Sequence, residues 1–145
     1  MADAKEKTIA LLSTTTSVIM GTDANGTKQI LYTAPEGKRC IPIMLVIRDA
    51  LGAGPVYDLT GCNDVDFGTG AACATQNFLN NETGIVDMTA QHDYMVLTAE
   101  SNEYTIIDGD AAAAVDREFG IQIIAGATDA DIVATIDVFG YLFDS

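Results

Sequence analysis

The side chains that could carry out catalysis are few and scattered along this sequence. His92 is the only histidine, and it stands beside Asp93 in a turn-like stretch just ahead of an apolar run. An acid–base pair or a metal site that needs two imidazoles therefore cannot form within one chain. The sequence also has no G-x-S-x-G elbow, no phosphate-binding loop and no dinucleotide-binding glycine motif. We expect a protein that is not an enzyme and that holds no cofactor.

Carboxylates gather in three places, and calcium is the ion that such oxygen-rich loops prefer. The clusters are Asp58 with Asp64 and Asp66, Asp108 with Asp110, and Asp129 with Asp131. None has the spacing of a helix-loop-helix calcium site: counted from Asp64, the twelfth position is Thr75, where a glutamate is needed. We interpret these aspartates as turn residues and expect no metal site, with calcium binding as the alternative.

The three cysteines, Cys40, Cys62 and Cys73, include no C-x-x-C pair, which excludes a zinc knuckle or a redox motif of that spacing. An odd number leaves at least one thiol unpaired. We expect buried free cysteines, as in a protein assembled in a reducing cytoplasm, and a structural disulfide is the alternative.

The elements that must position these residues are short strands, because apolar residues recur with a period of two between clusters of Gly, Asn, Asp and Pro. The expected strands cover residues 17–20, 28–33, 40–47, 64–68, 85–88, 94–98, 104–107, 119–123 and 132–143. The pattern predicts an all-β fold, a single antiparallel β-sandwich of about eight strands that is jelly-roll-like. We place this domain at residues 17–145. Residues 1–16 are either an extended N-terminal arm or the first strand.

Two of the expected strands, residues 40–47 and 132–143, are apolar on both sides, which is typical of a strand covered by a neighbouring subunit. In residues 40–47, alternation places Ile41, Ile43, Leu45 and Ile47 on one side and Cys40, Pro42, Met44 and Val46 on the other. Pro42 indicates an edge position or a bulge. We expect self-association through these two strands, at Ile41, Ile43, Met44, Val46, Phe139, Tyr141 and Phe143.

The net charge of -14 argues against nucleic-acid binding, because phosphate affinity depends on Lys and Arg. The charge is uneven: residues 49–145 hold seventeen carboxylates and one arginine, whereas residues 1–48 have two more basic than acidic residues. No apolar run approaches the roughly 20 residues of a membrane-spanning helix, and the charged beginning of the chain does not fit a secretory signal. We expect no membrane partner and no export by that route.

Several segments together resemble small structural proteins of tailed bacteriophages. They are residues 30–40 (ILYTAPEGKRC), 65–68 (VDFG), 119–121 (FGI) and 136–143 (IDVFGYLF). The resemblance implies a β-sandwich or jelly-roll domain of the capsid decoration (cement) or head-fibre type. It implies a non-enzymatic virion protein, made in the host cytoplasm, that binds the capsid exterior through the major capsid protein and forms a homotrimer. A receptor-binding or carbohydrate-binding jelly roll of a tail fibre is the alternative.

Attachment to the shell is expected from the segment that lacks the acidic excess. An extended arm can add main-chain hydrogen bonds to an exposed strand edge of a partner. In this chain Ile9, Leu11 and Leu12 would supply apolar anchors, and Lys5 and Lys7 would meet acidic groups of the capsid.

Overall fold

The chain is built almost wholly from β-strands. The computed structural model describes residues 8–75, 77–82, 85–99 and 105–145. Within these ranges nine strands occur: β1 (Ala10–Ile19), β2 (Lys28–Thr33), β3 (Lys38–Leu51), β4 (Asp64–Gly68), β5 (Asn77–Glu82), β6 (Tyr94–Thr98), β7 (Ile107–Asp108), β8 (Glu118–Ala125) and β9 (Val133–Asp144). The connections contain the 3-10 turns η2 (Thr22–Ala24), η3 (Ile85–Asp87) and η4 (Ala114–Arg117). In these same ranges no helix has the length and apolar character needed to span a membrane.

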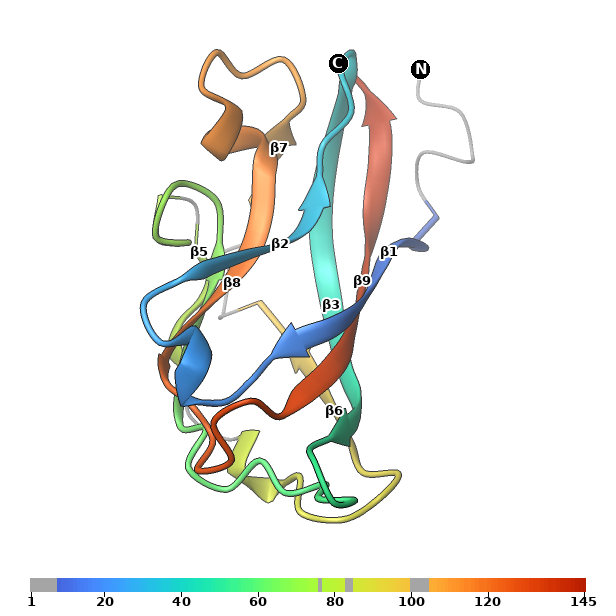
Figure 1. Ribbon diagram of the computed structural model, residues 1–145. Coiled ribbons are helices and arrows are strands. Elements are labelled where there is room, and N and C mark those ends of the chain that lie inside the picture. Colours follow the sequence, from blue (N-terminus) through green and yellow to red (C-terminus); the bar gives the residue numbers. More distant parts are fainter. Residues whose placement is uncertain (1–7, 76, 83–84, 100–104) are drawn as a thin grey trace.

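Two antiparallel sheets form the layers of a sandwich (Figure 1). One is a five-stranded sheet in the order β1-β9-β3-β6, with the short β7 also paired to β3. The other is a four-stranded sheet in the order β2-β8-β4-β5. With β7 set aside, this is the strand order of a jelly roll. The predicted all-β, antiparallel sandwich is confirmed.

Most strands lie where the sequence predicts them, and the differences have local causes. Strands β2, β4 and β6 have the predicted bounds. The strand predicted at residues 85–88 is wrong, because this segment forms η3, and Ile85 and Met88, three positions apart, are both buried. The prediction missed β5, whose sequence Asn-Phe-Leu-Asn-Asn-Glu has none of the β-branched residues that mark strands. Of the strand predicted at residues 104–107, Ile107 belongs to β7, and residue 104 lies outside the described residues.

Strand β1 begins at Ala10 and forms one edge of the five-stranded sheet, paired with β9. Its hydroxyl-rich middle reaches across to β2: the hydroxyls of Ser13 and Thr15 donate to the carbonyl of Leu31, at 2.8 and 3.2 Å. The Gln29 side chain accepts a hydrogen bond from the Ile19 backbone N–H at 2.8 Å and donates one to the Ile19 carbonyl at 2.7 Å. These bonds join the two sheets along this side, so residues 10–16 are part of the sandwich.

A β-bulge in β3 decides which of its side chains face the core. Pro42 and Met44 pair with consecutive residues of β9, so Ile43 is the extra residue. The strictly alternating arrangement predicted for residues 40–47 is therefore wrong. The buried side chains are Cys40, Pro42, Leu45 and Ile47, and the partly exposed ones are Ile41, Ile43, Met44 and Val46. The bulge predicted from Pro42 is present next to it.

The core lies between the two sheets. Its largest buried side chains include Phe67, Phe78 and Phe119, and the rings of Phe78 and Phe119 meet edge to face with centroids 5.7 Å apart. All three cysteines are buried and none forms a disulfide, as the sequence predicts. Burial raises the pKa of the Cys40 thiol to about 12 and those of Cys62 and Cys73 to about 11, because a thiolate loses its hydration there.

Candidate interaction surface

The outer surface of the five-stranded sheet is rich in large apolar side chains. An antiparallel sheet that packs one face on a core normally turns polar residues to water on the other. Here the outer face carries many large apolar residues, and we call ten of them, drawn from four strands, the apolar face. They are Leu11 of β1, Ile41, Met44 and Val46 of β3, Tyr94 and Val96 of β6, and Val133, Phe139, Tyr141 and Phe143 of β9.

The strand register brings these residues into rows across the sheet, since directly paired residues share a face. One row runs Leu11, Phe139, Met44 and Thr98, and the next runs Thr14, Asp137, Val46 and Val96. Exposure is highest on the two edge strands, where Leu11 is 54% exposed, Tyr94 70% and Val96 47%. The side chains of β3 and β9 between them are partly buried by their neighbours. The result is a largely apolar surface, with members on every strand from β1 to β6 across the sheet.

A single ion pair interrupts the middle of this surface. The Arg48 guanidinium donates from Nε to Asp137 Oδ2 at 2.8 Å, and Asp137 Oδ1 accepts a hydrogen bond from the Thr14 hydroxyl at 2.7 Å. The Arg48 side chain also contacts the Asp49 carboxylate. Together, the Arg48 and Thr14 hydrogen bonds hold the pKa of Asp137 below its usual value, against the opposing effect of its burial.

The charges on this face nearly cancel. Besides Arg48 and Asp137, the rows include Arg39, which lies opposite Asp108 with 3.9 Å between guanidinium and carboxylate. With Asp49, which also contacts Arg48, two arginines face three aspartates, whereas the whole chain has a net charge of -14. Little of the acidic excess of the protein therefore lies on the apolar face.

The outer face of the four-stranded sheet has a different character. Lys28 lies across it and donates from Nζ to the carbonyls of Gly70 and Glu118, at 2.8 and 2.9 Å. Gln122 and Asp66 continue the row that Lys28 begins. Among the described residues, Ile30 and Ile124 are the exposed large apolar side chains of this sheet. Polar groups dominate the rest of this face.

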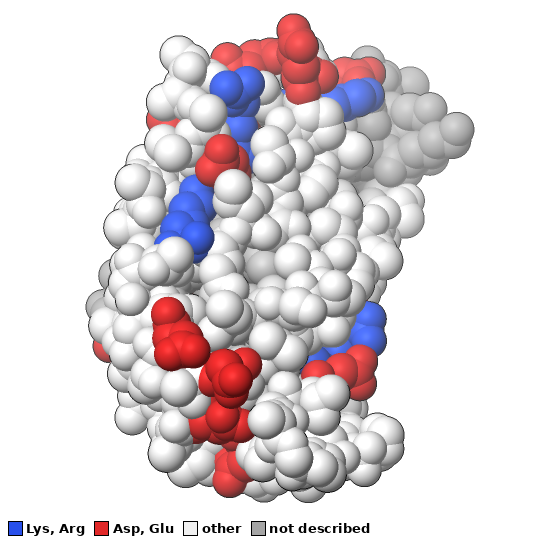
Figure 2. All heavy atoms as spheres, in the orientation of Figure 1, with Lys and Arg blue, Asp and Glu red and all other residues white. Residues whose placement is uncertain are grey.

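Figure 2 shows the molecule from the side on which β1 crosses from one layer toward the other. Acidic side chains gather toward the two ends of the sandwich. The middle of the view, where the uncharged strand β1 lies, has a wide area without Lys, Arg, Asp or Glu.

The seven residues predicted for self-association come together on one sheet. Six of them, Ile41, Met44, Val46, Phe139, Tyr141 and Phe143, belong to the apolar face, although alternation had assigned Ile41 to the opposite side from Met44 and Val46. The seventh, Ile43, is the bulge residue and is partly buried.

The residues predicted to contact a capsid lie at or before the start of β1. Ile9 is 46% exposed, and Leu11 belongs to the apolar face. Leu12 packs against the core, which makes it a poorer anchor than sequence alone suggests. Lys5 and Lys7 lie outside the described residues.

Sequence reasoning missed Tyr94 and Val96 as members of this surface. Alternation along residues 94–98 (YMVLT) could have found them, because it places Tyr94 and Val96 on one side of a strand and Met95 and Leu97 on the other. Residues Met95 and Leu97 pack against the core, so this strand is also apolar on both faces. The Arg48–Asp137 ion pair was not predictable, because it depends on the register between β3 and β9.

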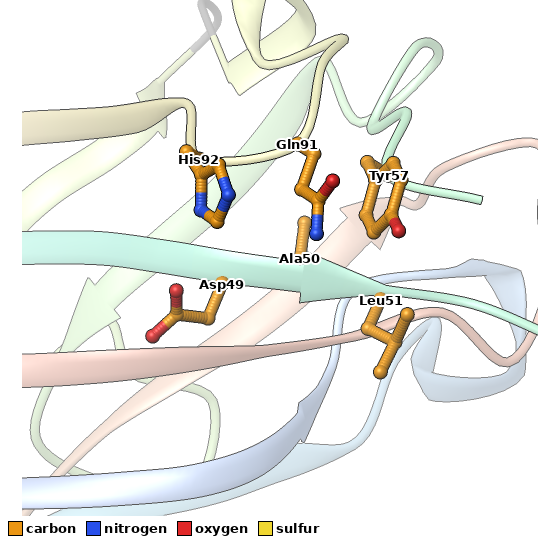
Figure 3. Close-up of a pocket in the computed structure, with 6 residues that line it drawn as sticks. All are labelled: Asp49, Ala50, Leu51, Tyr57, Gln91 and His92. Carbon is orange, nitrogen blue, oxygen red and sulfur yellow. The ribbon is translucent and has the colours of Figure 1, made fainter. Parts of the chain in front are cut away.

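A second feature is a pocket of about 280 Å³ at one end of the five-stranded sheet, lined by Asp49, Ala50, Leu51, Tyr57, Gln91 and His92. Figure 3 shows Tyr57, Gln91 and His92 on one side of β3, and Asp49 and Leu51 on the other. The pocket therefore contains a phenol, an amide and an imidazole, groups that are able to donate and to accept hydrogen bonds. The Asp93 carboxylate accepts hydrogen bonds from the backbone N–H groups of Thr89 and Ala90, which fixes the turn that carries His92.

The acidic residues are turn or loop residues only in part: Asp58, Asp110, Asp129 and Asp131 lie in loops and turns, whereas Asp64 and Asp66 belong to β4 and Asp108 to β7. The Asp58 carboxylate accepts hydrogen bonds from the backbone and side chain of Thr60, which lowers the pKa of Asp58. The Asp108 carboxylate accepts a bond from the Asp110 backbone N–H at 2.9 Å. Desolvation and the neighbouring Asp131 raise the pKa of Asp129. Over the described part of the chain, no three His, Cys, Asp or Glu side chains are grouped so that they could hold a metal ion.

Comparisons of this chain with protein-family models, with curated proteins and with solved structures gave no match.

Proposed function

We propose that this chain is a non-enzymatic structural protein of a tailed bacteriophage that binds the outer surface of the capsid and decorates or stabilises it. The observation that carries the proposal is the apolar face. Soluble monomers rarely expose a contiguous apolar area of several hundred Å², so a surface of this kind is typical of a protein that is covered in an assembly. The protein is made in the host cytoplasm and ends on the exterior of the virion.

The fold is compatible with this role. Jelly rolls form many viral shell proteins and also many lectins. The segments that resemble phage structural proteins belong to β2, β4, β8 and β9, the turn that follows β2 and the first residues of β3. Because one fold serves many functions, this support is an analogy, and the apolar face is the more specific argument.

The partners are the major capsid protein and further copies of the chain. We place the capsid contact just before β1, where Ile9 is exposed, with Lys5 and Lys7 preceding it, and leave Leu11 to the apolar face. We place self-association on the apolar face. The resemblance implies three copies, whereas the apolar face favours two.

Co-sedimentation tests the proposal. The purified chain is mixed with capsids of its phage that lack this protein, and the pellet is assayed for bound chain. We expect saturable binding with a fixed number of copies per capsid. Capsids that already carry the protein are the control and should bind none. A chain that stays in the supernatant with both kinds of capsid would rule the proposal out.

The pocket favours a second candidate function, the receptor-binding or carbohydrate-binding domain of a tail fibre. Tyr57, Gln91 and His92 offer a ring and several hydrogen-bonding groups in one pocket, which is the chemistry that a hydroxyl-rich ligand requires. A glycan array screened with the wild-type chain and with a Tyr57→Ala variant separates the two functions. Binding that depends on Tyr57, without capsid binding, would favour the tail-fibre function.

A further inference from the structure

We propose that two copies of this chain pack their apolar faces against each other around a two-fold axis, so that four β-sheets stack in one particle. This inference rests on the proposed role of the chain as an assembly protein and goes further by naming the partner of the apolar face.

Shape favours another sheet as the partner. Two β-sheets pack well face to face, about 10 Å apart, when the side chains between them are apolar. In this chain one outer sheet face has that character, and the other is polar and crossed by Lys28. A self-contact that buries the same patch on both copies is a two-fold contact. A trimer would instead join two different patches of each copy.

The area is sufficient for a stable pair. Strands β1, β9, β3 and β6 contain 10, 12, 14 and 5 residues. At about 3.4 Å per residue and about 4.8 Å between strands, the whole sheet face measures roughly 650 Å² per copy, or about 1,300 Å² for two copies. Specific interfaces bury about 1,200–2,000 Å² in total. The whole sheet face, its polar residues included, therefore reaches the lower part of that range without help from any loop.

Charge favours a second copy over a different partner. Two chains of net charge -14 repel each other over most of their surfaces. On the apolar face Arg39 and Arg48 nearly balance Asp49, Asp108 and Asp137, so two copies can approach there with little of that repulsion. A different, basic partner would bind better to the acidic parts of the surface and would not require a neutral patch.

The central ion pair can be buried in such a contact. Asp137 is 8% exposed and already accepts hydrogen bonds from Arg48 and Thr14. A buried charge is costly chiefly when its partner is missing, and here the partner lies on the same sheet. Covering this pair with a second sheet therefore leaves no carboxylate unpaired.

The test is the mass of the full chain by sedimentation equilibrium between about 1 and 100 µM, a range that covers typical weak and moderate dimers. We expect twice the 15.3 kDa chain mass at the upper end. The matched variants are Val96→Lys and Ile30→Lys. Both replaced residues lie on edge strands of their sheets, with exposed fractions of 47% for Val96 and 48% for Ile30, and both variants add one positive charge. Only Val96 belongs to the apolar face.

We expect Val96→Lys to weaken the dimer at least tenfold and Ile30→Lys to leave it unchanged. Circular dichroism shows whether each variant folds, and Tyr94→Lys, at a residue 70% exposed, replaces Val96→Lys if that variant does not. A wild-type mass of 15.3 kDa at every concentration, a trimer, or equal effects of the matched variants would each overturn the two-fold contact.

Capsid co-sedimentation is scored separately. A dimer that ignores capsids contradicts the proposed function alone, and a monomer that binds capsids contradicts this inference alone.

Discussion

Arg48 Nε lies 2.8 Å from Asp137 Oδ2, and this contact joins β3 to β9 in the middle of a sheet face that is otherwise largely apolar. The Arg48–Asp137 pair links the two central strands on the outer face, and the directly paired Leu45 and Val138 link them on the core face. The ion pair therefore contributes to stability and leaves the apolar face with little net charge.

Replacing Asp137 with asparagine is expected to lower the free energy of unfolding at pH 7 by about 1–2 kcal/mol. A charged hydrogen bond is lost, and the half-exposed Arg48 recovers part of its hydration. The folded-state pKa of Asp137 is lowered, so its contribution is fully present above the unfolded value of about 3.9 and is lost as the pH falls through the folded value. Urea unfolding from pH 7 to pH 3 should show the two proteins converging at low pH. A difference that stays constant with pH would contradict this assignment.

Lys28 is expected to contribute more to the free energy of unfolding than an exposed lysine does. Its ammonium group, on a side chain 10% exposed, donates to the carbonyls of Gly70 and Glu118 and lies 3.6 Å from the Glu118 carboxylate. Lys28→Met should lower the free energy of unfolding by about 2–3 kcal/mol, because these acceptors lose a charged donor. The control is Lys38→Met, whose exposed contact with Asp144 should contribute at most about 1 kcal/mol. Equal losses in urea titrations of the two variants would show that Lys28 does not hold the fold in this way.

The three thiols are expected to be unreactive in the folded protein. Their pKa values of about 11 to 12 leave almost no thiolate at pH 8, and all three side chains are buried. Titration with a disulfide reagent should modify them slowly in buffer and all three rapidly in denaturant. Rapid modification of one thiol in buffer would show that its segment opens, which the buried core does not predict.

Deletion of residues 1–9 separates attachment from folding, because β1 begins at Ala10. We expect capsid binding to fall at least tenfold while the unfolding midpoint changes little. Replacing Lys5 and Lys7 with alanine should have a smaller effect that disappears at high salt, since exposed ion pairs contribute about 0–1 kcal/mol each. Unchanged binding by the deleted chain would move the capsid contact to the body of the sandwich.

The sequence predicted the architecture better than it predicted the surface. Period-two patterns located β2, β4 and β6 at their observed bounds, because each is a short run bounded by turn residues. The pattern did not locate β5, where pairing with β4 overrides the weak strand preference of its asparagines.

The composition of the apolar face was partly predictable. Phe139, Tyr141 and Phe143 could be assigned to one side of a strand by alternation alone. The side of Ile41 could not, because the bulge at Ile43 changes the phase of β3. The pocket residues Tyr57 and Gln91 come from separate loops, and no local pattern links them.

A cryo-electron microscopy map of the intact virion tests the central claim most directly. The account predicts a two-layered β-sandwich on the outer surface of the capsid, with the start of β1 toward the shell and the apolar face covered by protein density. Density for the chain at the tip of a tail fibre, or a capsid-bound sandwich with Phe139, Met44 and Val96 facing solvent, would contradict it.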